Sequence, residues 1–306
     1  MENIRQNILK TLAYFDVFNY PLTNIEVGRF LPQKCNQLVV NELLYQLTKE
    51  NRIYNINDFY SLQNEPQLAE IRIAGNKRAI QLLKIAQRAA RLLSWFPFVE
   101  SVAVSGSLSK NFADQNADID FFIITSPNRL WIARTCMHIF KKFTYLIRKQ
   151  SWFCMNYYID EMQMEIVEKN HFTAMEIVTL MPMQGINCFR KFLEANSWTA
   201  NYFRRQTFFK EKNKEIKKVF FRRCFERIFS SNLGDIVENW LMNVTNKRWK
   251  RKTEKGRVND HGAIMAMVID PHFSKPDPAI FQKKVVRQFE EKLRRYQVNN
   301  EVVIQE

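Results

Sequence analysis

The first fifty residues alternate between apolar positions at helical spacing and residues that break helices. This pattern predicts three short helices, over residues 4–18, 23–31 and 38–48. Asn19-Tyr20-Pro21 ends the first helix, and Pro32 ends the second. Thr23 is suited to cap the second helix, because its hydroxyl oxygen can accept a hydrogen bond from a backbone N–H of the first turn.

The period of the pattern changes after the third helix. Residues 52–56 and 59–62 alternate between apolar and polar side chains around Asn57-Asp58, which predicts a β-hairpin. Three short helices followed by a hairpin are typical of a winged helix, so we expect a winged-helix-like domain over residues 1–65. The exposed side chains of its third helix are mainly amides and carboxylates, which cannot neutralise DNA phosphates. The module is therefore predicted to pack against protein rather than to read DNA.

A long apolar helical stretch over residues 66–96 is predicted to connect this module to a second region. Pro97 ends that helix, and residues 99–104 predict a short strand that runs directly into Gly106 and Ser107. The chain has only seven glycines, so a glycine at this junction is informative. A turn or helix start here can present backbone N–H groups to a phosphate, and Lys110 could add a positive charge to that contact.

The next predicted strand, over residues 117–125, carries two aspartates in an otherwise apolar run. Side chains alternate along a strand, so Asp118 and Asp120 are expected on one face. Two carboxylates held close together raise the pKa of at least one of them unless a cation lies between them. Hard oxygen ligands of this kind suit Mg²⁺ bound together with substrate phosphates. An isolated D-x-D pair is also found on solvent-exposed edge strands, so the pair alone is a weak motif.

The combination of these features is more specific than each part. Gly106-Ser107 after one strand and Asp118-x-Asp120 in the next resemble the signature of the DNA polymerase β-like nucleotidyltransferase superfamily. The run PFVESVAVSGSLSKNFADQNADIDFFIIT also looks like a group of bacterial proteins that carry a winged-helix segment before the transferase domain. The resemblance implies a mixed-sheet nucleotidyltransferase core over residues 97–165, in which Gly106 and Ser107 bind the phosphates of a nucleoside triphosphate, with ATP expected, and Asp118 and Asp120 hold Mg²⁺.

Active members of that superfamily usually carry a third carboxylate on a later strand, here expected over residues 152–160. Asn156 lies nearer the centre of this strand, where the acid is expected, but an amide cannot act as a general base. Asp160 can act as a base, but it lies at the strand end. Asp160 is therefore taken as a catalytic candidate, and Asn156 as the alternative third-acid position. Arg134 and His138 share a helix between these strands and are expected to be structural.

Length and composition favour a soluble multidomain α/β protein. The 306 residues include 46% hydrophobic and 25% charged residues, without an apolar run long enough to span a membrane. The first ten residues lack the apolar segment of a secretory signal, so a cytoplasmic location without a membrane partner is expected. The five cysteines are scattered and are read as buried thiols.

The formal net charge of +15 is concentrated in the last third of the chain. Residues 166–306 read as an all-helical C-terminal domain, and its basic residues are Arg204, Arg205, Lys210, Lys212, Lys214, Lys217, Lys218, Arg222, Arg223, Arg227, Lys247, Arg248, Lys250, Arg251 and Lys252. Such clusters suit a nucleic-acid partner, although a solvated basic helix face is equally compatible with them.

Two functions follow from these features. The first is Mg²⁺-dependent transfer of a nucleotidyl group from a nucleoside triphosphate to an acceptor that the sequence does not identify. The alternative is a non-catalytic regulator with a degenerate nucleotidyltransferase fold that binds a nucleotide or a nucleic acid. Asn156 favours the alternative, whereas the intact pair of Asp118 and Asp120 favours the enzyme.

Overall fold

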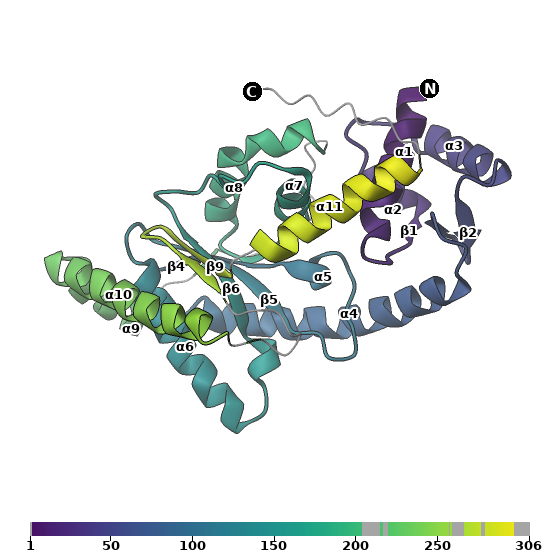
Figure 1. Ribbon diagram of the computed structural model, residues 1–306. Helices are drawn as coiled ribbons and strands as arrows, with labels where there is room; N and C mark the ends of the chain where they lie inside the picture. The colour runs from purple at the N-terminus through teal and green to yellow at the C-terminus, as the bar shows by residue number, and fades with distance from the viewer. Residues whose placement is uncertain are drawn as a thin grey trace.

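A mixed six-stranded sheet forms the centre of the protein, with helices on both of its faces (Figure 1). The computed structural model describes residues 2–203, 215–216, 220–256, 258, 266–276 and 279–296. The strand order is β7-β4-β5-β6-β9-β8, and β5 and β6 are parallel whereas the other neighbours are antiparallel. The strands are β4 (Val99–Val104), β5 (Asp120–Thr125), β6 (Cys154–Asp160), β7 (Met181–Gln184), β8 (Met267–Ile269) and β9 (Phe273–Pro276).

Alternating side chains of β5 divide the core into two layers. Phe121 and Ile123 pack with the helices on one face, and Phe122 and Ile124 pack with those on the other. The first face is covered by α4 (Pro66–Leu93), α6 (Leu130–Leu146), α9 (Phe220–Phe229) and α10 (Asn232–Glu254). The second is covered by α7 (His171–Thr179) and α8 (Ile186–Ala195). Both faces of the central strands are therefore buried, as their apolar sequence requires.

The N-terminal elements form a small unit of three helices and three short antiparallel strands. They are α1 (Glu2–Asp16), β1 (Leu22–Thr23), α2 (Asn24–Arg29), α3 (Gln37–Lys49), β2 (Tyr54–Ile56) and β3 (Phe59–Ser61), with strand order β1-β3-β2. The three predicted helices and the hairpin are confirmed. Thr23 caps α2 as expected, and Glu26 returns the hydrogen bond to complete a capping box. The pairing of β1 with the hairpin was not predicted.

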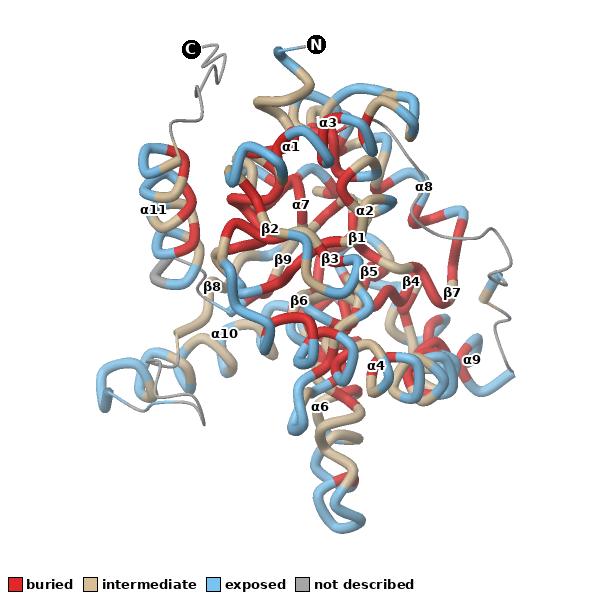
Figure 2. The backbone as a smooth tube through the Cα atoms, turned by 90° about the vertical axis from the view of Figure 1, so that its right-hand side faces the viewer, coloured by how far each residue is buried: buried red, intermediate tan, exposed pale blue. Residues whose placement is uncertain are grey.

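This N-terminal unit shares its hydrophobic core with the rest of the protein. Ala174 and Met175 of α7, and Val285 and Phe289 of α11 (Ala279–Arg295), belong to the same buried cluster as the inner faces of α1, α2 and α3. Figure 2 shows the buried parts of α1, α2 and α7 gathered in one region. The unit thus packs against protein, in agreement with the expectation from its third helix.

A buried arginine ties the long helix α4 to the N-terminal unit. Arg72 is 1% exposed, and its guanidinium donates to the Pro21 carbonyl at 2.6 Å and pairs with Glu26 at 2.5 Å. The guanidinium also lies over the Tyr20 ring, 3.8 Å from its centroid. The Tyr20 hydroxyl donates in turn to the Lys110 carbonyl, next to the turn that follows β4. The N-terminal unit is therefore in contact with the candidate site.

The expectation of an all-helical C-terminal domain over residues 166–306 is wrong. Strands β7, β8 and β9 come from this part of the chain and complete the central sheet at both edges. Pro182 lies in β7, an edge strand, where the missing N–H of proline costs no ladder hydrogen bond.

The helices of the described segments differ in length and apolarity. None of them is both long and apolar enough to cross a lipid bilayer.

Candidate functional site

The turn after β4 is held against the first residue of β5. The short helix α5 (Gly106–Ser109) begins directly after this strand, and Gly106 has a φ of +66°. A Cβ atom at Gly106 would lie 2.8 Å from Oδ2 of Asp120. The Ser105 N–H donates to the Asp120 carbonyl at 2.9 Å. A side chain at position 106 would thus be strained and would displace the carboxylate.

Replacing Gly106 with alanine should impair the site more than the fold. A left-handed conformation costs a residue other than glycine about 1–2 kcal/mol, and here the methyl group also meets Asp120. Gly256 is a matched control, because its φ is +58° and a Cβ there meets nothing within 4 Å. We expect similar losses of unfolding free energy for Gly106→Ala and Gly256→Ala in denaturant titrations, with nucleotide affinity lost only in Gly106→Ala. Equal nucleotide affinities in the two variants would contradict this role of Gly106.

Asp118 and Asp120 lie in different local structures. The strand predicted from residue 117 begins only at Asp120, and Asp118 lies exposed in the segment before it. Ile119 between them is buried, and its N–H donates to the Ser151 carbonyl at 2.8 Å. The predicted common strand face is therefore corrected, because β5 is shorter than expected. The two carboxylates nevertheless interact, since the charge of Asp118 contributes to raising the pKa of Asp120.

The carboxyl group of Asp120 is in an environment that disfavours its charge. Burial is the main cause of its raised pKa of about 6, opposed by a hydrogen bond from Cys154. The charges of Asp118 and Glu176 raise the pKa further, and that of Lys141 lowers it. A divalent cation would lower the pKa of Asp120, because it stabilises neighbouring carboxylates in their ionised form.

Asn156 lies directly beside Asp120. Its side-chain N–H donates to Oδ1 of Asp120 at 2.5 Å, and its own oxygen accepts from the Cys154 thiol at 3.2 Å. The register of β5 and β6 shifts between Phe121 and Phe122, and Asn156 is the residue of β6 left without a partner. The structure thus brings Asn156 to the place where the sequence analysis expected a third carboxylate.

Asp160 lies at the opposite end of the sheet from Asp120. In the parallel pairing of β5 and β6, Asp120 is opposite Cys154 and Asp160 is opposite Thr125. The Asp160 side chain is completely buried and accepts from the backbone N–H groups of Asn128 and Met162, both at 2.9 Å. The choice of Asp160 as a catalytic base next to Asp118 and Asp120 is therefore corrected, because its strand runs away from them.

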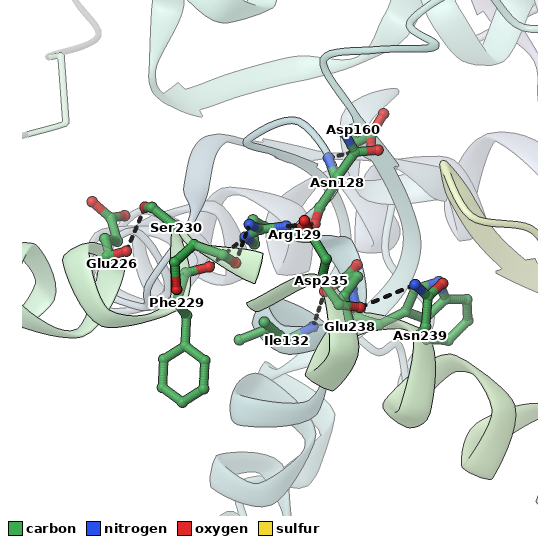
Figure 3. A network of polar contacts seen from close by, with 12 residues as sticks. Asn128, Arg129, Ile132, Asp160, Glu226, Phe229, Ser230, Asp235, Glu238 and Asn239 are labelled. Atoms are coloured by element: carbon green, nitrogen blue, oxygen red, sulfur yellow. Dashed lines mark hydrogen bonds and ion pairs between the residues drawn. The ribbon is translucent and has the colours of Figure 1, made fainter. Parts of the chain in front are cut away.

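Asp160 instead belongs to a structural network at the start of α6 (Figure 3). The Nδ1 atom of His272 lies 3.0 Å from Oδ2 of Asp160. Nearby, Arg129 pairs with Asp235 at 2.7 Å, and Glu238 accepts from the N–H groups at the start of α6, Trp131 and Ile132. These contacts attach α10 to α6 and satisfy backbone donors that the helix start leaves free.

Replacing Asp160 should therefore affect stability and not nucleotide binding. Asp160→Ala removes two partly buried hydrogen bonds from backbone N–H groups to a carboxylate, each worth about 1.5–3 kcal/mol. Asp160→Asn keeps one acceptor oxygen and should cost less. Denaturant titration measures the unfolding free energy, and calorimetry with Mg²⁺ and ATP measures affinity. A large loss of affinity in a stably folded Asp160→Asn variant would contradict this assignment.

Ser107 and Lys110 occupy opposite kinds of environment at the turn. Ser107 is exposed. The Lys110 ammonium donates to the Gly106 carbonyl at 3.2 Å and pairs with Glu176 at 2.8 Å. Lys110, which was expected to add a positive charge to a phosphate contact, is therefore paired with a carboxylate in this structure. A phosphate at the turn would have to share this ammonium with Glu176.

Glu176 is a residue of the site that the sequence analysis did not identify. It lies on α7, contacts Lys110, and acts electrostatically on Asp120. No local spacing in the sequence connects α7 to the turn after β4. The two come together because α7 packs on the sheet face next to β4 and β5.

The side chains at the site fit Mg²⁺ only in the presence of a substrate. Among the described residues, no group of three or more acidic, histidine or cysteine side chains is arranged to hold a metal ion. Asp118 and Asp120 supply two carboxylates, and Mg²⁺ in phosphoryl-transfer proteins is commonly bound by one or two carboxylates plus phosphate oxygens and water. The residues present therefore suit a metal that arrives with a phosphorylated ligand.

The basic clusters of the last third are only partly described. Residues 204–214 and 217–219, which hold many of these side chains, lie outside the described residues. Arg222 is buried rather than solvent-facing and pairs with Glu226 at 2.7 Å and Glu100 at 3.3 Å. Arg248 and Lys252 lie on α10.

Comparison with known proteins adds no relative. The chain matches no protein-family model, no curated protein and no solved structure.

Proposed function

We propose that this protein transfers a nucleotidyl group from a nucleoside triphosphate, with ATP as the expected donor, to an acceptor in an Mg²⁺-dependent reaction. The proposal rests on one observation above all. The Gly106 turn, which can present backbone N–H groups, is packed against a partly buried carboxylate, Asp120, that lacks a closely bound cation among the described residues. Phosphates and a divalent cation would satisfy both groups at once.

In this proposal each residue has a limited task. The N–H groups and hydroxyl at Gly106 and Ser107 bind the terminal phosphates and orient the α-phosphate toward the acceptor. Asp118 and Asp120 hold Mg²⁺, which when bound neutralises charge on the phosphates and on the leaving pyrophosphate. Lys110 moves between Glu176 and a phosphate oxygen, a short displacement for a flexible ammonium side chain.

The flanking parts of the chain have supporting roles in the proposal. The N-terminal unit is interpreted as a winged helix that acts as a packing module, because its core is continuous with α7 and α11. The central sheet is interpreted as a nucleotidyltransferase core, whose strand pairing places Gly106 and Asp120 together.

A second candidate function is supported by Asn156. An amide that donates to Asp120 occupies the place of a general base and cannot remove a proton from an acceptor hydroxyl. The alternative is thus a protein that binds Mg²⁺ and a nucleotide at the proposed site residues and regulates a partner, but does not transfer a nucleotidyl group.

Label transfer distinguishes these functions. The protein is incubated with Mg²⁺ and each nucleoside triphosphate carrying ³²P at the α- or the γ-phosphate, with and without a cell extract as the source of acceptors. Nucleotidyl transfer attaches the α-phosphate to the acceptor and releases the γ-phosphate in pyrophosphate, so only α-label should become attached to the acceptor. Transfer of γ-label would contradict the proposed reaction, and tight Mg²⁺-dependent binding without any transfer would favour the regulator.

A further inference from the structure

Arg134 on α6 is a buried cation without an acidic partner among the described residues. It is 7% exposed, and its Nε atom has no hydrogen-bond partner. The contact described for its Nη2 is a long one, 3.5 Å to the sulfur of Met267. Burying a charge costs several kcal/mol unless another group compensates it. The location of Arg134 therefore favours an anion.

Two further buried polar atoms without partners lie next to Arg134. They are Nε2 of His138, one turn further along α6, and the hydroxyl of Tyr158 on β6. The His138 and Tyr158 rings are 6.1 Å apart between centroids, and the Arg134 guanidinium lies 5.8 Å from the Tyr158 ring centroid. Most buried polar side-chain atoms in proteins have a partner, so three such atoms in one place indicate an absent ligand.

The charges around these atoms are positive. The pKa of His138 is lowered to about 2, first by burial and then by four nearby cations, Arg134, Lys141, Arg248 and Lys252. Arg248 and Lys252 come from α10, which crosses α6 and packs against it (Figure 1). We call Arg134, His138, Tyr158, Lys141, Arg248 and Lys252 the α6–α10 cation cluster. Lys141 also acts on Asp120, so the cluster adjoins the candidate site.

We propose that the α6–α10 cation cluster binds a phosphate group. The cluster has a guanidinium, an imidazole and a phenol that can donate to one ligand, and three further cations around them, which favours an anion with more than one negative charge. A phosphate has more acceptor oxygens and up to two negative charges, and arginine binds it well.

The cluster and the candidate site occupy different places on the sheet. Tyr158 is opposite Ile123 in the pairing of β5 and β6, and both residues belong to the layer under α6. Asp120 precedes Phe121 on β5, so strand alternation places its side chain on the other face of the sheet. The phosphate site is therefore separate from the nucleotide site of the proposed function.

Inorganic phosphate is the probe for the site. It is titrated calorimetrically into the full chain without metal or nucleotide. Arg134→Met should lower phosphate affinity by about 10- to 100-fold, because it removes charge-assisted hydrogen bonds. Lys142→Met is the matched control, since Lys142 is an exposed cation on the same helix. Equal affinities in wild type and Arg134→Met, or the same loss in Lys142→Met, would overturn the proposal.

Thermal unfolding separates a ligand site from a structural role. Without phosphate, Arg134→Met should be at least as stable as wild type, because it removes an uncompensated buried charge. Phosphate should raise the Tm of wild type and not that of Arg134→Met. Tyr158→Phe, which keeps the ring and removes the hydroxyl, should lower phosphate affinity without lowering stability. A lower Tm of Arg134→Met in phosphate-free buffer, with phosphate affinity kept in Tyr158→Phe, would overturn the site.

Two controls distinguish this inference from the proposed function. Asp120→Asn should retain phosphate affinity, and Mg²⁺ with ATP should not displace phosphate from the wild type. Competitive displacement would place the phosphate in the nucleotide site and overturn the proposal of a separate site. Retained phosphate binding in a protein that binds no nucleotide would support the phosphate site and contradict the proposed transfer.

Discussion

Replacing Asp120 with asparagine should abolish Mg²⁺-dependent nucleotidyl transfer while the protein stays folded. Asp120 is the partly buried carboxylate at the site, and its amide analogue carries no negative charge to hold a divalent cation. Loss of residues that only support metal ligands already costs about 10- to 100-fold, so loss of a ligand should cost at least about 100-fold in rate. The rate of α-label transfer at saturating Mg²⁺ measures the effect.

Asp114→Asn is the matched control for this substitution. Asp114 is an exposed aspartate in the segment that leads into β5, and the change removes the same charge. It should leave the transfer rate unchanged. Similar rates in wild type, Asp114→Asn and Asp120→Asn would remove Asp120 from the site, provided that circular dichroism shows the three proteins equally folded.

Replacing Asn156 with aspartate should have the opposite effect on transfer. Asn156 donates to Asp120, so a carboxylate at this position lies where a base could take the proton of an acceptor hydroxyl. A positioned base typically contributes about 10²–10⁴-fold in rate. If the missing base limits the wild type, Asn156→Asp should increase transfer by a factor in this range.

The same substitution should make stability depend on Mg²⁺. A second carboxylate beside Asp120 adds repulsion that a bound cation relieves. The Tm of Asn156→Asp should therefore rise more with Mg²⁺ and nucleotide than that of wild type. Asn156→Ala is the control, because it removes the hydrogen bond without adding charge. If Asn156→Asp and Asn156→Ala have the same rate and the same Mg²⁺ response, this position is not the site of the base.

The features that depend on local pattern were predictable from the sequence. Helical spacing and breakers defined the three N-terminal helices, and the period of two defined the hairpin. Gly106 was identifiable because a single glycine between a strand and a polar turn is informative in a chain with few glycines. Its contact with Asp120 follows from the antiparallel pairing of two neighbouring strands.

The features that depend on long-range pairing were not predictable. Pro182 in β7 is compatible with a strand only at a sheet edge, and nothing in the local sequence shows which segment forms that edge. Asn156 and Asp160 lie at different distances from Asp120 because β5 and β6 are parallel with a register shift. Asn156 lies beside Asp120, whereas Asp160 lies at the far end of the strand pair. The contact of Glu176 with Lys110 likewise arises from packing of a distant helix.

The most direct test of the central claim is a calorimetric titration of ATP into the wild-type protein with Mg²⁺ and again with EDTA. If the Gly106 turn and Asp118 with Asp120 together bind a metal–nucleotide complex, ATP should bind in Mg²⁺ and lose most of its affinity in EDTA, where Asp120 lacks its cation. Equal affinity for ATP under the two conditions, or no binding under either, would contradict the account.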